Sequence, residues 1–240
     1  MKCLILASGF GTRLYPVTKK TAKGLLPYKG KPVIDYIVES IPGGIEINVA
    51  SNRKFEAQYR KWQGEINRDV RLFVEPVENE EQSLGAVGSL EYWVRQNAID
   101  DDLLVIAGDN YFEMDMTHFI SRFDGEHTLV AVYDIGDRRD ACQFGVVQLD
   151  EDKITSLAEK PREPQSSLVA TACYLFPAGV LAALNDYCKQ GRKDNLGNFI
   201  AHLIGCGSVQ AYVFNGAWFD IGNIWPRLEA ENHNKGGEQC

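Results

Sequence analysis

Hydrophobic and polar positions along the chain follow two alternating patterns. Short runs of β-branched and aliphatic residues are typical of buried strands, and the amphipathic stretches between them have helical spacing. The runs predict strands at residues 2–7, 45–51, 70–75, 103–109, 128–135, 145–150, 168–176 and 209–214. The amphipathic stretches predict helices at residues 32–41, 53–66, 83–97, 115–124, 177–190, 196–205 and 222–232.

The order of these elements predicts an α/β fold. Strand and helix alternate in the first half, which indicates a Rossmann-like, doubly wound, mostly parallel sheet with helices on both faces. After about residue 128 the strands cluster, so we expect antiparallel strands to be added to the same sheet. Because no repeat and no Pro-, Gly- or Ser-rich linker interrupts the chain, we expect a single domain over residues 1–240 with a frayed tail at 232–240.

Charge and cysteine content narrow the class of protein. The formal net charge of −8 disfavours a nucleic-acid binder, because such proteins present broad positive surfaces to phosphates. The apolar run at residues 3–7 is too short for a signal or membrane segment. The six cysteines contain no CxxC pair, which is typical of thiols in a reducing compartment. We therefore expect a soluble cytoplasmic protein that binds neither nucleic acid nor membranes and holds any anionic ligand by a local cluster.

The first 34 residues depart from this acidic balance. They contain no Asp or Glu, and their seven basic residues are Lys2, Arg13, Lys19, Lys20, Lys23, Lys29 and Lys31. The small residues at 8–12 follow the first strand directly, at the edge where parallel sheets bind ligands. Their backbone N–H groups can face a phosphate, while Arg13 adds a planar fork of donors and Lys23 a mobile charge. This segment predicts a phosphate cradle, the alternative being a tight turn beside a solvated cationic face.

Other phosphate-binding and catalytic motifs do not match the sequence. A dinucleotide fingerprint needs a third glycine where Leu14 stands, and the segment at 24–32 lacks the spacing and hydroxyl of a P-loop. The four histidines have no ligand spacing, and no G-x-S-x-G elbow or Cys-His arrangement suggests covalent catalysis.

Two aspartates are candidates for holding a metal ion. Asp109 ends a very apolar strand beside Gly108, and Asp220 follows Trp218 and Phe219. Since Mg²⁺ prefers one or two carboxylates together with phosphate oxygens and water, two acids from distant segments suffice. The alternative for each is a turn or a helix cap.

The glycine segment also resembles a known family. The run G-F-G-T-R-L-Y-P-V-T at 9–18, followed by K-G-L-L-P at 23–27, is similar to the signature of sugar-1-phosphate nucleotidylyltransferases. The G-D-N and W-x-D-x-G motifs around Asp109 and Asp220 match the family's metal-binding aspartates. The resemblance implies Mg²⁺-dependent transfer of a nucleotidyl group from a nucleoside triphosphate to a sugar 1-phosphate, with Arg13 and Lys23 as catalytic residues.

The resemblance also implies two groups of binding residues. Those for the nucleotide are Ala7, Ser8, Gly9, Gly11, Thr12, Gln82, Gly85 and Asn110. Those for the sugar phosphate, carried by the Q-F-G-V, E-K-P and V-A-T-A-C-Y segments and a following arginine, are Gly145, Glu159, Lys160, Ala170, Thr171, Tyr174 and Arg192. The chain departs from the family's pattern at Glu80, where thymidylyltransferases carry glutamine, and at Phe144 and Ala172, where tyrosine and glycine are usual.

These departures leave several functions open. The first is use of a hexose 1-phosphate with dTTP or UTP, and the second is cytidylyl or guanylyl transfer to another sugar phosphate or to phosphocholine. A third, of another class, is an inactive nucleotide-sugar-binding regulatory subunit. Each of these functions is compatible with a homo-oligomer. We expect no C-terminal β-helix within 240 residues, unlike family members with acyltransferase activity.

Overall fold

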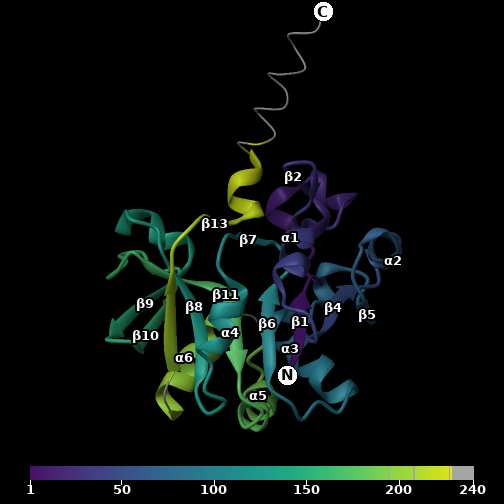
Figure 1. Ribbon diagram of the computed structural model, residues 1–240. Coiled ribbons are helices and arrows are strands. Elements are labelled where there is room, and N and C mark those ends of the chain that lie inside the picture. The colour runs from purple at the N-terminus through teal and green to yellow at the C-terminus, as the bar shows by residue number, and fades with distance from the viewer. Residues whose placement is uncertain (194, 208, 227, 229–240) are drawn as a thin grey trace, which may run out of the picture.

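The computed structural model describes residues 1–193, 195–207, 209–226 and 228. Within them a main sheet is built from β1 (Lys2–Leu6), β4 (Glu46–Asn52), β5 (Val70–Glu75), β6 (Leu103–Ala107), β8 (Thr128–Asp134), β9 (Gly145–Asp150), β10 (Lys153–Glu159), β11 (Leu168–Phe176) and β12 (Val209–Phe214). The strands lie in the order β5–β4–β1–β6–β11–β8–β12–β10–β9, and the sheet spans the molecule in Figure 1.

Strand direction divides the sheet as the sequence predicts. Strands β5, β4, β1 and β6 are mutually parallel. Strand β11 runs antiparallel between β6 and β8, and β10 and β9 are added in antiparallel fashion, as expected for the second half. Strand β12 differs from that expectation, because it lies parallel to β8. The carboxyl ends of β1 and β6 therefore lie side by side at one edge, which is where the candidate site is found.

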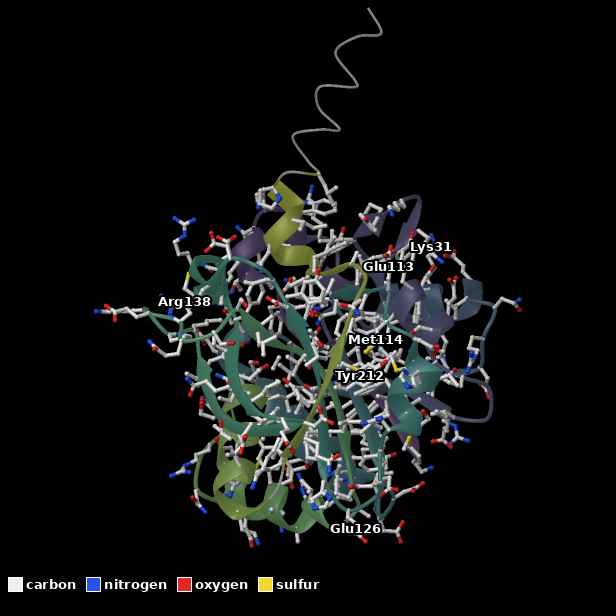
Figure 2. The ribbon with its side chains drawn as sticks, turned by 60° about the vertical axis from the view of Figure 1, so that its left-hand side comes forward. Lys31, Glu113, Met114, Glu126, Arg138 and Tyr212 are labelled. Atoms are coloured by element: carbon white, nitrogen blue, oxygen red, sulfur yellow. The ribbon has the colours of Figure 1, made fainter. Side chains whose placement is uncertain are left out.

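Helices cover both faces of the sheet, which confirms the doubly wound prediction. They are α1 (Val33–Ser40), α2 (Glu56–Glu65), α3 (Gly85–Gln96), α4 (Met116–Ser121), α5 (Val180–Lys189) and α6 (Leu196–Cys206). Successive strand residues point to opposite faces, so Cys3 and Ile5 pack with α1, α2 and α4, whereas Leu4 packs with α3, α5 and α6. Met114 and Tyr212, labelled in Figure 2, belong to the first of these two clusters.

Four short strands and β10 are absent from the sequence-based prediction. The short strands are β2 (Pro27–Tyr28), β3 (Lys31–Pro32), β7 (Asn110–Phe112) and β13 (Trp218–Asp220). Strands β7 and β13 pair antiparallel, with Asp220 opposite Asn110. This two-stranded ribbon joins segments more than 100 positions apart and brings Asp220 beside Asp109.

The end of the chain is described only in part. Residues 221–226 are helical, as predicted, but the rest of the predicted helix at 222–232 is described only at residue 228. The tail predicted at 232–240 lies outside the described residues. Among the described helices, none combines the length and the hydropathy that crossing a membrane requires.

Candidate functional site

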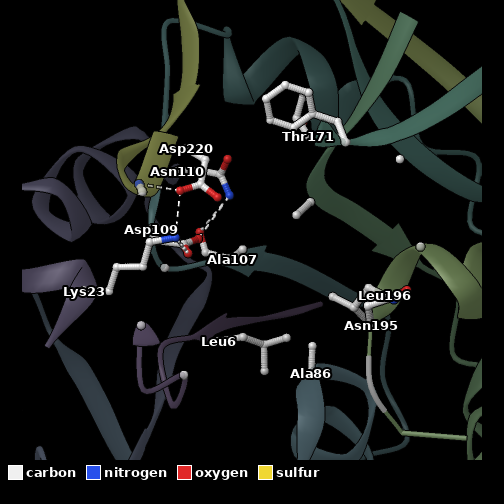
Figure 3. Close-up of a pocket in the computed structure, with 18 of the residues that line it drawn as sticks. Leu6, Lys23, Ala86, Ala107, Asp109, Asn110, Thr171, Asn195, Leu196 and Asp220 are labelled. Atoms are coloured by element: carbon white, nitrogen blue, oxygen red, sulfur yellow. Dashed lines mark hydrogen bonds and ion pairs between the residues drawn. The ribbon is translucent and has the colours of Figure 1, made fainter. Parts of the chain in front are cut away.

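A pocket of about 470 Å³ opens at the carboxyl ends of β1 and β6 (Figure 3). Its walls come from the turn after β1, the turn after β6, the start of α3, strand β11, the start of α6 and β13. The predicted site residues that line it are Ala7, Ser8, Gly9, Gly11, Thr12, Arg13, Lys23, Gly85, Asp109, Asn110, Gly145, Glu159, Lys160, Ala170, Thr171, Tyr174 and Asp220. Residues from both halves of the chain thus meet in one cavity.

The turn after β1 is fixed by its backbone contacts. Gly11 has a φ of 63°, in the left-handed region that glycine adopts without strain, and an added Cβ would lie 3.0 Å from Thr18 Cγ2. Thr18 Oγ1 donates a hydrogen bond to the Gly11 carbonyl at 2.7 Å. Asn52 Nδ2, at the end of β4, donates to the Ser8 carbonyl at 2.7 Å. These contacts hold the small residues open toward the pocket, as a phosphate cradle requires.

Lys23 bridges the two candidate metal ligands. Its Nζ lies 2.6 Å from Asp109 Oδ2 and 2.7 Å from Asp220 Oδ1 (Figure 3). Burial alone would lower the pKa of Lys23, but the two carboxylates outweigh it and hold the pKa above its usual value. Burial and the Asp109 charge raise the pKa of Asp220, and Lys23 opposes this rise. The two aspartates therefore form a shared anionic site that is occupied by an internal cation.

Close backbone packing holds the segment that carries Lys23 beside the two aspartates. A Cβ on Gly24 would lie 2.6 Å from the Gly108 carbonyl oxygen, and a Cβ on Gly222 would lie 2.7 Å from Lys23 Nζ. Trp218 Nε1 donates to Asn110 Oδ1 at 2.9 Å, which ties the strands of the ribbon together beside the aspartates. The first contact is with backbone, so only glycine fits at position 24, and the segment that carries Lys23 packs directly against the turn that carries Asp109. The second contact is with the end of the flexible Lys23 side chain.

The aspartate pair fits a small divalent cation in its donor chemistry. Hard oxygen ligands suit Mg²⁺, which commonly takes one or two protein carboxylates and completes its shell with phosphate oxygens and water. Both carboxylates already converge on one positive charge, and no group of three or more His, Cys, Asp or Glu side chains suited to a metal is found in the described ranges. The residues present thus fit an ion that shares its coordination with a bound triphosphate.

Glu159 forms the other end of the pocket. A Cβ on Gly145 would lie 3.2 Å from Glu159 Oε2, and a Cβ on Gly197 only 2.5 Å away. The carboxylate therefore sits against two glycines, one at the start of β9 and one in the first turn of α6. Asn195, the N-cap of α6, also lines this end and accepts a hydrogen bond from the Asn198 backbone N–H at 2.8 Å. Lys160 Nζ is 3.6 Å from Glu159 Oε1 and half exposed.

Two predicted binding residues lie away from the pocket lining. Gln82 is exposed in the 3₁₀ turn Glu80–Gln82, where its Oε1 accepts from the Glu78 backbone N–H at 3.0 Å. Arg192 is exposed with its guanidinium 5.5 Å from the centre of the Tyr187 ring. Both residues are assigned to binding from their motif position alone, and they lie in loops whose sequences depart from the family's pattern.

Several lining residues have no counterpart in the sequence-based prediction. They are Ser83, Ser89, Gln143, Asn195, Gly197, Gly222 and Asn223. The sequence could have indicated the two glycines as site residues, because Gly197 interrupts a helical pattern and Gly222 lies two positions after the candidate metal ligand Asp220. No sequence pattern indicates the polar residues, since their place in the pocket depends on contacts between segments far apart in the chain.

A buried carboxyl group lies beneath the phosphate turn. Glu75 ends β5 and is 1% exposed. Burial raises its pKa above the ordinary value of 4.5, while hydrogen bonds from Ser89 and Ser8 oppose the rise. Ser8 Oγ and Ser89 Oγ are themselves 3.1 Å apart. Glu75 thus connects the edge of the sheet to two residues that line the pocket.

We expect Glu75→Gln to increase the free energy of unfolding more at about pH 7.5 than at about pH 4.5. Because its folded-state pKa is raised, the folded protein keeps this proton at pH values where the unfolded chain has lost it. Stability is therefore lost as pH rises above 4.5, and the amide removes that loss. Urea unfolding at both pH values measures the effect, with Glu78→Gln on the exposed following loop as the control. Equal gains for Glu75→Gln at the two pH values would contradict the assignment.

The protein is therefore a mixed α/β protein with a pocket at one edge of its sheet. On one side of the pocket lies a glycine turn with basic residues, and on the other lies a pair of aspartates. The sequence of the protein matches the model of the nucleotidyl transferase family over residues 2–235, and the chain belongs to that family.

Alignments with two curated relatives cover nearly all of this chain. It is 30% identical over 239 residues to the bifunctional protein GlmU of Methanocaldococcus jannaschii, covering 97% of this chain and 54% of GlmU. It is 31% identical over 237 residues to glucose-1-phosphate thymidylyltransferase of Streptomyces antibioticus, covering 95% of this chain and 65% of that enzyme. The chain thus spans between about half and two thirds of the length of these relatives.

The fold also matches solved structures. A crystal structure from Bacillus anthracis, provisionally assigned as a glucose-1-phosphate thymidylyltransferase and bound to sucrose, superposes with a TM-score of 0.81 at 27% identity. The match covers 96% of this chain and 94% of that chain.

Proposed function

We propose that the protein transfers a nucleotidyl group from a nucleoside triphosphate to a sugar 1-phosphate, giving an NDP-sugar and pyrophosphate in an Mg²⁺-dependent reaction. The observation that carries the proposal is the Lys23 ammonium held between Asp109 and Asp220 in one pocket with the glycine turn and Glu159. Membership of the nucleotidyl transferase family and the named activity of the thymidylyltransferase relative support it.

The reaction needs no general base. The phosphate monoester of the acceptor has a second pKa near 6, so at neutral pH it is largely a dianion and a competent nucleophile. One of its oxygens forms a bond to the α-phosphorus of the triphosphate. The bond from the α-phosphorus to its bridging oxygen breaks, and pyrophosphate leaves with the electron pair. The protein's task is therefore placement and neutralisation of charge.

The residues of the pocket divide this task by position. Backbone N–H groups of residues 8–12 cradle the triphosphate, and the exposed guanidinium of Arg13 steadies the leaving pyrophosphate. Lys23 moves from the aspartates toward the α-phosphate and stabilises the charge that develops there. Lys160 holds the phosphate of the acceptor, while Glu159 accepts hydrogen bonds from sugar hydroxyls.

Asp109 and Asp220 would hold Mg²⁺ together with phosphate oxygens once the triphosphate draws Lys23 away. Bound there, the ion would supply neutralisation of charge between the two anionic reactants. The half-buried aspartates need a counter-charge in either state, and the Lys23 ammonium fills that need when substrate is absent.

A matrix of nucleoside triphosphates and phosphate acceptors tests the proposal. We expect pyrophosphate release with a hexose 1-phosphate and dTTP or UTP in the presence of Mg²⁺. CTP and GTP, and phosphocholine as acceptor, test the cytidylyl and guanylyl alternatives in the same plate. Absence of pyrophosphate from every combination would overturn the enzymatic proposal in favour of a binding subunit.

We expect Gly197→Ala to raise the KM for the sugar 1-phosphate about 10- to 100-fold, with a smaller effect on the KM for the triphosphate. The added Cβ would lie 2.5 Å from Glu159 Oε2, so the carboxylate must move and lose its hydrogen bonds to the sugar. A hydrogen bond to a charged group contributes about 1.5–3 kcal/mol, which corresponds to that range.

Gly205→Ala is the matched control for this variant. Gly205 lies in the same helix, and its added Cβ would meet nothing within 4 Å. Initial rates with each substrate varied in turn separate the two KM values. An unchanged acceptor KM in Gly197→Ala would remove Glu159 from the acceptor site.

A further inference from the structure

Backbone conformation singles out two residues of the pocket. Among the described residues, the non-glycine positions with positive φ are Lys29, Ala98, Glu151, Lys160 and Ala172. The first three lie in turns: Lys29 between β2 and β3, Ala98 after α3 and Glu151 between β9 and β10. Lys160 and Ala172 both line the pocket. Unusual backbone conformation that clusters at a cavity points to a functional cause.

Ala172 occupies the centre of an irregularity in β11. Ala170 pairs with Val132 of β8, and the next paired residue, Tyr174, lies opposite Val130. Four steps along β11 therefore match two along β8, which is the geometry of a bulge. Bulges re-aim side chains and occur beside active sites. This one turns residue 172 into the pocket wall.

Ala172 lies between the two ends of the site. The residue that follows Ala172, Cys173, pairs with Ile106 of β6, which lies three residues before Asp109. On its other side, Ala170 pairs with Gly145, against which Glu159 rests. A sugar phosphate that reaches from Glu159 to the reacting centre at Lys23 therefore passes Ala172.

The methyl group at this position has a cost. Glycine adopts a φ of 55° without strain, whereas an L-residue with a Cβ is strained there. The methyl group is partly buried against the cluster packed with α3, α5 and α6. The free energy gained by burying part of one methyl group is smaller than the free energy cost of this strain. Packing alone therefore does not explain why a residue with a Cβ occupies this position.

We propose that Ala172 is a specificity-determining residue whose methyl group narrows the path between Glu159 and Lys23, and so selects compact, unsubstituted hexose 1-phosphates over acceptors with a substituent larger than a hydroxyl group, of which an acylated amino group is the test case. The inference rests on the proposed function and adds the acceptor class to it. The discrimination is steric. One methyl or methylene group in a fitted pocket changes kcat/KM by about 10- to 200-fold.

The test compares matched acceptors with purified Ala172→Gly. Glucose 1-phosphate and N-acetylglucosamine 1-phosphate, and the corresponding galactose pair, are each assayed with the best triphosphate by pyrophosphate release. We expect wild type to favour the unsubstituted member of each pair. Ala172→Gly should shift the kcat/KM ratio toward the acetylated member by at least about 10-fold in one pair or both.

Two further variants keep the result interpretable. Ala98→Gly removes the same kind of strain (φ 48°) at an exposed position outside the pocket lining, so it should leave the ratio unchanged. Ala172→Asn keeps a residue that tolerates the left-handed region but adds bulk, and it should raise the KM for the unsubstituted hexose 1-phosphate by at least about 10-fold.

The possible outcomes test this inference and the proposed function separately. An active wild type whose ratio stays the same in Ala172→Gly, or a wild type that uses both members of each pair equally well, overturns the inference alone. A wild type without product in any reaction overturns the proposed function and the inference with it.

Discussion

Lys23→Ala is expected to reduce turnover by at least about 100-fold, the loss typical of removing one preorganised electrostatic group. The ammonium group contacts Asp109 and Asp220 at 2.6 Å and 2.7 Å, and it lines the same pocket as the glycine turn that we propose cradles the triphosphate. Without it, charge that develops at the α-phosphorus has no mobile cation. Steady-state pyrophosphate release at saturating substrates measures the effect.

Stability must be followed in the same experiment. Removal of Lys23 leaves two partly buried carboxylates facing each other, so the variant loses some folding free energy as well. Lys23→Met keeps the apolar stem of the side chain and serves as a second variant. Lys20→Ala, an exposed lysine in the same cationic segment, is the matched control and should retain wild-type turnover. A folded Lys23 variant that also turns over normally would remove Lys23 from the reaction.

Asp109→Asn is expected to produce a comparable loss, at least about 100-fold in turnover, through a different mechanism. The amide keeps the shape of the side chain but cannot neutralise a divalent cation, so the Mg²⁺ concentration for half-maximal activity should also rise at least about 10-fold. Titration of activity with Mg²⁺ measures both changes.

The control for this variant is Asp100→Asn, because Asp100 is exposed at the amino end of β6, away from the pocket. It should leave the Mg²⁺ titration unchanged. If Asp109→Asn lowers turnover while the Mg²⁺ requirement stays at the wild-type value, then Asp109 acts only as the partner of Lys23 and not as a metal ligand.

Local pattern predicts the regular part of the fold. Eight strands of the main sheet and helices α1–α6 have the predicted type, because their apolar residues recur at the spacing of a strand or a helix. Strand β10 is different. Its pairing with β9 shifts register between Ile154 and Ser156, so its buried residues Ile154 and Leu157 are three positions apart instead of two. The bulge removes the alternation that would have predicted a strand.

Long-range pairing explains what else the sequence does not predict. Strands β7 and β13 have three residues each, which is too short for a periodic signal, and they pair across more than 100 positions. Long separation in the chain also hides the contact of Lys23 with the two aspartates, which lie 86 and 197 positions away from it. Motif letters predict each of these three residues as functional. Only the folded chain reveals that the ammonium of Lys23 lies between the two carboxylates.

Transfer of label from the α-phosphate of a triphosphate measures the central claim most directly. The protein is incubated with Mg²⁺, a hexose 1-phosphate and dTTP or UTP labelled at the α-phosphorus. Label is expected to appear in the NDP-sugar, in equal amount to the pyrophosphate released and only when both substrates are present. Label that stays in the triphosphate, or appears only as free nucleoside monophosphate, would contradict nucleotidyl transfer at this site.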